Sequence, residues 1–150
     1  MRVLALDLGT STGWAISHTD GTVTSGVQSF EQKRFDGGGM RYLRFRRWME
    51  ETLDLGGVEE VRYEEVRRHA ATTAAHVYGG FLAVLTSMCE ERNIPYAGEP
   101  VGTIKRHATG KGNADKTAMI AAARARGWSP KDDNEADALW ILDLVLTKGA

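Results

Sequence analysis

The stretch that decides the fold is MRVLALDLGTSTGWAIS, residues 1–17. It contains a short apolar run, Val3–Leu8, with a single acidic residue, Asp7. Gly9–Gly13 is rich in glycine, serine and threonine, which is typical of a turn, and the apolar pattern resumes over Trp14–Ser17. We therefore expect two strands joined by a turn, with an acidic side chain near the end of the first strand.

The following segment continues the strand pattern and then changes to alternating helices and strands. Asp20–Gly21 is typical of a turn, and Val23–Phe30 would complete a meander of three antiparallel strands. Gly37–Gly39 interrupts the chain before Met40–Leu53, where apolar residues recur at helical spacing. The short, β-compatible run Val58–Val66 then predicts a fourth strand.

The second half of the chain predicts three more helices and one more strand. We expect a long helix over Ala70–Arg92 with Thr72 or Thr73 as its N-cap, a strand over Ile94–Ala97, a helix over Ala114–Arg126 capped by Asn113, and a last helix over Asn134–Leu146. Three antiparallel strands followed by two parallel ones predict an α/β protein, with a mixed five-stranded sheet and helices on both faces. This is the element order of the ribonuclease-H-like fold.

Length and composition indicate one globular domain. The 150 residues, 42% of them hydrophobic, can bury one core but are too few for two ordinary domains, so we expect a single domain over residues 1–150. The longest apolar stretch, Ala136–Leu146, is interrupted by two aspartates and is shorter than a membrane span. The N-terminus lacks the order of an export signal, and the single cysteine, Cys89, cannot form an internal disulfide. We expect a cytoplasmic protein with no membrane contact.

Charges of opposite sign are separated along the sequence. The formal net charge is −1, which is unusual for a protein that binds nucleic acid. Basic residues nevertheless gather around 41–47, 67–69 and 105–116, whereas acids gather around 50–65 and 132–137. A basic face and an acidic pocket can therefore coexist on one molecule.

Three carboxylate positions on different elements are candidates for a metal site. Asp7 lies in an apolar strand, Glu64 or Glu65 ends the fourth strand, and Asp137 lies early in the last helix, one turn after Asn134. Hydrolysis of a phosphodiester with two divalent ions needs several carboxylates that converge from different elements. Because a strand covered on both sides can place either parity toward the site, alternation does not decide between the two glutamates.

Each of these acidic residues also has an ordinary structural explanation. Asp7 could serve the turn that follows it, and the glutamates could lie at the surface of a strand end. Asp132, Asp133 and Glu135 suit the N-terminus of a helix, where acids are favoured by the helix dipole. The coincidence of all three candidate positions in this order favours the metal site.

Four runs of this sequence resemble RuvC Holliday junction resolvases, particularly the compact phage versions. They are DLGTSTGWA (7–15), YEEV (63–66), GKGNADK (110–116) and NEADAL (134–139). The resemblance implies a homodimeric nuclease that hydrolyses DNA at branch points, leaving a 5′-phosphate and a 3′-hydroxyl. It also implies Asp7, Glu64 and Asp137 as ligands of two magnesium ions, with manganese expected to support activity, and it favours Glu64 over Glu65.

The chain departs from the family at the fourth ligand, which is usually acidic or histidine and is Asn134 here. An amide oxygen can coordinate magnesium but carries no charge, and the neighbouring Asp133 is the alternative ligand. The resemblance gives Lys116 a place near the reacting phosphate. The expected DNA-binding residues are Arg67, Arg68, His69, Lys105, Arg106, Lys111 and Lys116. His76 and His107 are expected to be structural or to face phosphate.

The partner is expected to be branched DNA together with a second copy of the chain. Paired nicks across a two-fold junction favour a two-fold protein, and the helix from Ala70 is the candidate interface, through Ala74, Ala75, Val77, Tyr78 and Phe81.

Three alternatives stay open at this point. One is a nucleotide-binding domain of the sugar-kinase or actin-like type, although those folds need two related domains and we expect no nucleotide cofactor. Another is a catalytically weak or inactive junction-binding protein, in which Asn134 marks a lost metal site. The third is a nuclease that cuts flaps, forks and other branches as well.

Overall fold

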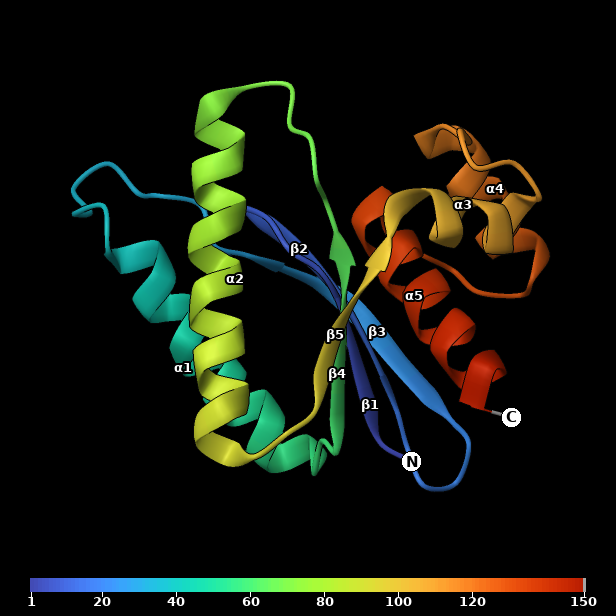
Figure 1. Cartoon of the computed structure of the whole chain (residues 1–150), viewed down its shortest axis with the longest axis horizontal. Helices are drawn as coiled ribbons and strands as arrows, with labels where there is room; N and C mark the ends of the chain where they lie inside the picture. Colours follow the sequence, from blue (N-terminus) through green and yellow to red (C-terminus); the bar gives the residue numbers. More distant parts are fainter. Residues whose placement is uncertain (150) are drawn as a thin grey trace.

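The computed structural model describes residues 1–149, and a five-stranded sheet forms its centre (Figure 1). The strands are β1 (Val3–Asp7), β2 (Ser11–Ser17), β3 (Val23–Ser29), β4 (Glu60–Glu65) and β5 (Tyr96–Pro100). Their order across the sheet is β3-β2-β1-β4-β5. The first three strands pair antiparallel, and β4 and β5 add to β1 in parallel. The predicted mixed sheet is therefore confirmed.

Helices cover both faces of the sheet, as predicted. On one side lie α1 (Met40–Gly56) and α2 (Thr72–Arg92), and on the other lie α3 (Val101–Thr109), α4 (Lys116–Ala125) and α5 (Asp133–Gly149) (Figure 1). No helix within residues 1–149 is both long and apolar enough to cross a membrane.

Strand alternation divides the core into two layers, one on each side of the sheet. In β1, Leu4 and Leu6 pack among the residues of α1 and α2, whereas Val3 and Ala5 pack against α5. A cluster of aromatic rings around Phe81 fills the first layer, and the apolar length of α5 fills the second. Because β1 is buried on both faces, any polar residue in it has to be satisfied inside the protein.

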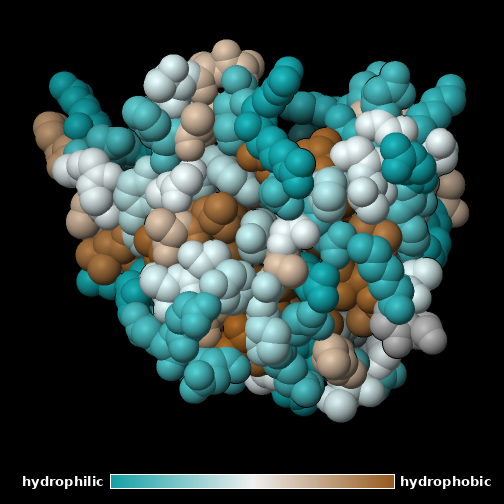
Figure 2. All heavy atoms as spheres, in the orientation of Figure 1, coloured by the Kyte–Doolittle hydropathy of each residue, from teal (hydrophilic) through white to brown (hydrophobic). Residues whose placement is uncertain are grey.

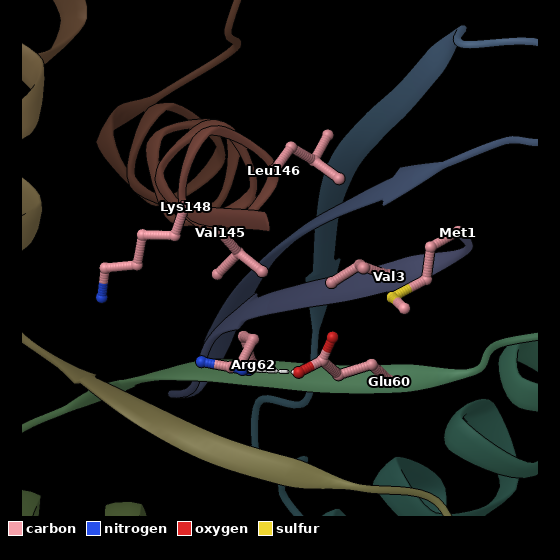
Figure 3. A pocket seen from close by; sticks show the side chains of 7 residues that line it. All are labelled: Met1, Val3, Glu60, Arg62, Val145, Leu146 and Lys148. Carbon is pink, nitrogen blue, oxygen red and sulfur yellow. Dashed lines mark hydrogen bonds and ion pairs between the residues drawn. The ribbon is translucent and has the colours of Figure 1, made fainter. Parts of the chain in front are cut away.

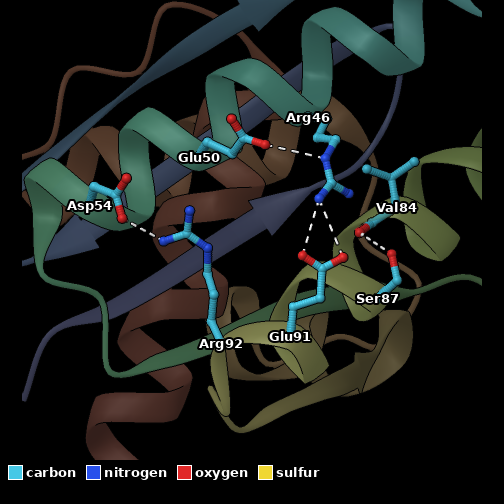
Figure 4. A network of polar contacts seen from close by, with 7 residues as sticks. All are labelled: Arg46, Glu50, Asp54, Val84, Ser87, Glu91 and Arg92. Atoms are coloured by element: carbon cyan, nitrogen blue, oxygen red, sulfur yellow. Dashed lines mark hydrogen bonds and ion pairs between the residues drawn. The ribbon is translucent and has the colours of Figure 1, made fainter.

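Ion pairs tie α1 to α2 on the outside of the first layer. Figure 4 shows Arg46 between Glu50 of its own helix and Glu91 of α2, at 3.2 and 3.1 Å, and Arg92 paired with Asp54. Arginines that the sequence presents as a basic helix face are thus partly engaged in structural contacts, and they leave less free positive charge than their number indicates.

Several predicted boundaries are wrong. Strand β2 begins at Ser11 inside the expected turn, because Ser11–Ser17 pairs along its length with β3. Strand β5 covers Tyr96–Pro100 instead of Ile94–Ala97, and helix α3 was not predicted at all. Helix α3 has only nine residues, and Ile104 is the one that is fully buried.

Two predicted helix caps are also wrong. Helix α4 begins at Lys116 instead of Ala114, and Asp115 instead of Asn113 caps it by accepting from the Ala118 N–H at 2.8 Å. A carboxylate three residues before that N–H is an effective cap for a helix end. Helix α2 has Ala71 at its N-cap and no side-chain cap, so neither Thr72 nor Thr73 has the predicted role.

Candidate active site

Two parallel strands bring acidic residues to the same edge of the sheet. β1 and β4 are neighbours with Leu6 beside Tyr63, so Asp7 and Glu64 lie at adjacent strand ends. Asp7 has the parity of Val3 and Ala5 and therefore faces α5. In β4, Val61 and Tyr63 pack toward α1 and α2, which turns Glu64, and not Glu65, toward α5. The structure thus settles the parity that the sequence left open.

The start of α5 is held close to β2 by a glycine and by two acidic residues. A Cβ at Gly13 would lie 1.9 Å from the carbonyl oxygen of Asn134, so only glycine allows this approach. Asp132 accepts from the Glu135 N–H at 2.9 Å, and Glu135 accepts from the Lys131 N–H at 2.9 Å and from the Ser25 hydroxyl at 2.7 Å. The capping role predicted for Asp132 and Glu135 is confirmed, and it fixes the first turn of the helix.

Asp7, Glu64 and Asp137 converge into one cluster. Each offers a carboxylate oxygen, and these oxygens lie within 4.8 Å of one another. Burial, with the nearby carboxylates of Glu64 and Asp137, raises the pKa of Asp7 well above its usual range. Burial and Glu64 raise the pKa of Asp137 to about 7, and the hydrogen bond with Asp7 and, more weakly, the charge of Lys105 oppose the shift.

These carboxylates fit a divalent cation. Three half-buried carboxylates close together are hard oxygen donors of the kind that magnesium or manganese favours, and a cation there would offset their repulsion. The tyrosine hydroxyl of Tyr78 steadies the end of β4, because it donates to the Glu64 carbonyl at 2.8 Å and accepts from the Val66 N–H at 3.3 Å. Sequence analysis missed this positioning role.

Asn134, Asp133 and Lys116 lie beside the cluster. Asp133 is not part of the three-carboxylate group, and it forms an ion pair with Lys116 at 3.7 Å. All three line a groove of about 860 Å³, together with Leu8, Gly9, Thr10, Arg41, Val66, His69, Ala71, Thr73, Ala74, Val77 and Tyr78. In Figure 1, β4 and β5 end near the middle of the molecule, below the top of α2, and Figure 2 shows mostly hydrophilic side chains on the upper part of this face.

The predicted DNA-binding residues lie on several sides of this edge. His69 lines the groove, whereas Arg67 and Arg68 line a neighbouring hollow between the end of β4 and the start of α3. The side chain of Arg67 is 79% exposed and pairs with Glu65 at 3.1 Å. On or just after α3, Lys105 is half-buried near Asp137, and Arg106 and Lys111 are exposed.

Two histidines and two apolar residues of α2 have positions outside the carboxylate cluster. His107 pairs with Asp143 of α5 at 2.8 Å, which confirms a structural contact, and His76 lies exposed on α2. Tyr78 and Phe81 were predicted to form a dimer interface, and this is wrong because both are buried against the sheet of their own chain.

Another hollow, of about 440 Å³, lies at the opposite end of β1 and β4 (Figure 3). Its charged side chains are paired: Arg62 bonds to Glu60 and to the buried Glu99, and Lys148 bonds to Glu99 at 2.9 Å. Such a self-neutralised pocket offers little to a charged ligand, so the chemistry of the molecule is concentrated at the carboxylate edge.

Sheet order, helix placement and the carboxylate cluster together define a ribonuclease-H-like domain with an acidic centre. Comparison with solved structures agrees. The chain is similar to RuvC of Thermus thermophilus in complex with a Holliday junction substrate, with 21% identity and a TM-score of 0.75 over 94% of this chain and 90% of that one. A second Thermus thermophilus RuvC structure gives 22% identity and a TM-score of 0.74 over the same shares.

The yeast mitochondrial Holliday junction resolvase Ydc2 is similar over 93% of this chain and 75% of its own, with 15% identity and a TM-score of 0.62. No protein-family model matches the sequence, and no curated protein is significantly similar to it. At these identities the likeness establishes the fold, and the resemblance to RuvC predicted from four sequence runs is confirmed at that level.

Proposed function

We propose that the protein is a metal-dependent, structure-specific endonuclease that resolves Holliday junctions and other branched DNA. The observation that carries the proposal is the convergence of Asp7, Glu64 and Asp137 at one edge of a RuvC-like fold. One of the similar proteins is bound to a Holliday junction substrate, and another is named as a Holliday junction resolvase. Neither the junction-binding protein without activity nor the nucleotide-binding domain explains a carboxylate cluster of this kind as well.

Asp7, Glu64 and Asp137 would hold magnesium or manganese, two ions per site, with the neutral amide of Asn134 as a fourth donor. When bound, such ions supply activation of water and stabilisation of charge on the leaving oxygen. We assign the fourth position to Asn134 in preference to Asp133, because Asp133 already faces Lys116. The loss of one negative charge there would weaken one of the two sites.

The remaining roles belong to basic side chains around the cluster. Lys116 is the first residue of α4, so it adds a positive charge where the helix dipole already favours a phosphate. Lys105 lies near Asp137 and would balance negative charge as the phosphate approaches. Arg67, Arg68, His69, Arg106 and Lys111 would contact the DNA backbone on either side, through charge instead of base readout.

We further propose that the protein acts as a homodimer, because paired nicks across a two-fold junction favour a two-fold protein. With Tyr78 and Phe81 turned inward, the exposed residues His76, Gly79, Ala83 and Ser87 recur at helical spacing and form a row of mostly small residues on the free surface of α2. This row allows two helices to approach closely. Light scattering of the unaltered protein should give twice the monomer mass. The Ala83→Arg variant should give the mass of one monomer. A mass equal to the monomer for the unaltered chain would rule the dimer out.

We place this activity in the cytoplasm, that of the host if the protein is phage-encoded.

A nicking assay tests the proposed function. End-labelled four-way junctions, flaps, forks and linear duplex of the same sequence are incubated with the protein and magnesium, manganese or EDTA. We expect nicks near the branch that need a metal and that run faster on branched DNA than on duplex. Binding without any nick would favour the inactive junction-binding protein, and equal rates on all branched substrates would favour a broader debranching nuclease.

A further inference from the structure

The groove beside the carboxylates contains one fixed positive charge that no acidic side chain neutralises. Its charged members are Arg41, Lys116 and Asp133, and the last two form an ion pair. Among residues 1–149, Arg41 takes part in no salt bridge and no side-chain hydrogen bond, although it is half-buried. Two other arginines of α1 are paired, Arg44 with Asp36 and Arg46 with Glu91, and the unpaired Arg47 is exposed to solvent, unlike Arg41.

The Nε–H of Arg41 is also an unsatisfied donor. Within the described chain it is the one buried side-chain nitrogen or oxygen that has no hydrogen-bond partner. Leaving such a group unpaired costs free energy, and proteins keep few of them. An unsatisfied cationic donor in a groove next to a reactive centre is therefore best explained by an acceptor that arrives with the substrate.

Contacts of the neighbouring residues fix the backbone on both sides of Arg41. The next residue, Tyr42, packs its ring against Phe81 with centroids 5.2 Å apart, and it lies so close to α2 that a Cβ at Gly80 would meet it at 2.4 Å. Asp36 pairs with Arg44 and accepts from the Lys33 N–H at 2.8 Å, which fixes the loop before the helix. These contacts fix the backbone from which the Arg41 side chain extends, so the start of α1 needs no rearrangement when Arg41 binds a ligand.

We infer that Arg41 is a further DNA-binding residue, whose guanidinium binds a backbone phosphate of the strand that enters the groove, next to the phosphate that is cut. This inference rests on the proposed function. A guanidinium presents a planar fork of donors that matches two phosphate oxygens, and phosphate supplies both the negative charge and the acceptors that Arg41 lacks. The groove that it shares with Gly9, Thr10 and Asn134 runs along residues adjacent to the carboxylates.

The test combines cleavage with the salt dependence of binding. We expect Arg41→Gln to lower nicking of a four-way junction by about tenfold, the size of one charge-assisted hydrogen bond. Binding is measured without cleavage in an Asp7→Asn background. There, Arg41→Gln should make the slope of log affinity against log salt less steep by about one, whereas Arg41→Lys should keep the slope. Arg47→Gln, exposed on the same helix outside the groove, is the matched control and should change neither quantity.

Replacing single phosphates by uncharged methylphosphonates identifies the phosphate that Arg41 contacts. Junctions with a single methylphosphonate at successive positions near the branch should show one position at which the parent loses affinity and the Arg41→Gln variant does not. A merely structural role would produce no such position, and that result would overturn the inference, as would nicking by Arg41→Gln at the unaltered rate. Absence of nicking by the unaltered protein would instead count against the proposed function, while the binding measurements would still decide the role of Arg41.

Discussion

At the scale of single residues, the carboxylate cluster is costly for the folded protein. Burial and the nearby carboxylates raise the pKa values of Asp7 and Asp137, so holding these charges beside Glu64 opposes folding. Such an arrangement sacrifices stability for function. A folded protein with such a cluster becomes more stable when one of the charges is removed or when a cation binds.

We therefore expect Asp7→Asn to abolish nicking and yet to raise the melting temperature in EDTA at pH 8, by the equivalent of roughly 1 to 3 kcal/mol. Magnesium should raise the melting temperature of the unaltered protein and should have much less effect on the variant. Differential scanning fluorimetry with and without metal measures both effects. A variant that melts lower than its parent in EDTA would show that Asp7 contributes a favourable contact, contrary to our interpretation.

Adjacent glutamates give a matched pair of variants. Glu64 faces the cluster, whereas Glu65 has the parity of Val61 and Tyr63 and pairs with the exposed Arg67. Glu64→Gln should lower nicking by about a hundredfold or more, because it removes one ligand charge, and Glu65→Gln should stay close to the parent rate. Single-turnover nicking at saturating magnesium makes the comparison. The opposite order would mean that the end of β4 is turned over when DNA binds.

At the scale of elements, the sequence predicts those site residues that interrupt the apolar pattern of a strand or helix. Asp7 in an apolar strand and Asp137 on an apolar helix are recognisable as site residues, because a charged side chain in apolar surroundings is costly unless it has a function. The choice between Glu64 and Glu65 depends on which face of β4 meets α5, and this is a tertiary contact. The inward direction of Tyr78 was missed although local spacing indicates it, because the buried residues Tyr78, Phe81 and Leu85 recur at helical spacing along α2.

One close approach between elements should control activity. The start of α5 lies so near β2 that a Cβ at Gly13 would overlap the Asn134 carbonyl. We expect Gly13→Ala to push this helix end away, to displace Asp137, and to lower nicking by about a hundredfold, as displacements near 1 Å can do. Gly38→Ala is the control, because a Cβ there has nothing within 4 Å. Equal activity of the two variants would show that the site tolerates movement of α5.

At the scale of the whole molecule, one aspartate joins the three helices that cover the second face of the sheet. Asp143 of α5 accepts from His107 of α3 at 2.8 Å and from Arg126, which follows α4, at 2.8 Å. Burial alone would raise the pKa of Asp143, but the hydrogen bonds from Arg126 and His107 outweigh it and hold the pKa below its usual value. The ionised form therefore stabilises the packing of this layer.

A carboxyl whose pKa is lower in the folded than in the unfolded protein stabilises the fold above its unfolded pKa, and this contribution is lost as the pH falls through the folded value. Asp143→Asn should therefore lower the free energy of unfolding by about 1 to 3 kcal/mol at pH 7. The difference in the free energy of unfolding between variant and parent should shrink toward zero as the pH falls through the lowered pKa of Asp143. Urea titrations at pH 7, 5 and 3 measure it, with EDTA present so that no metal binds. A difference that stays constant down to pH 3 would mean that shape and packing at this position matter more than the charge that links the three helices.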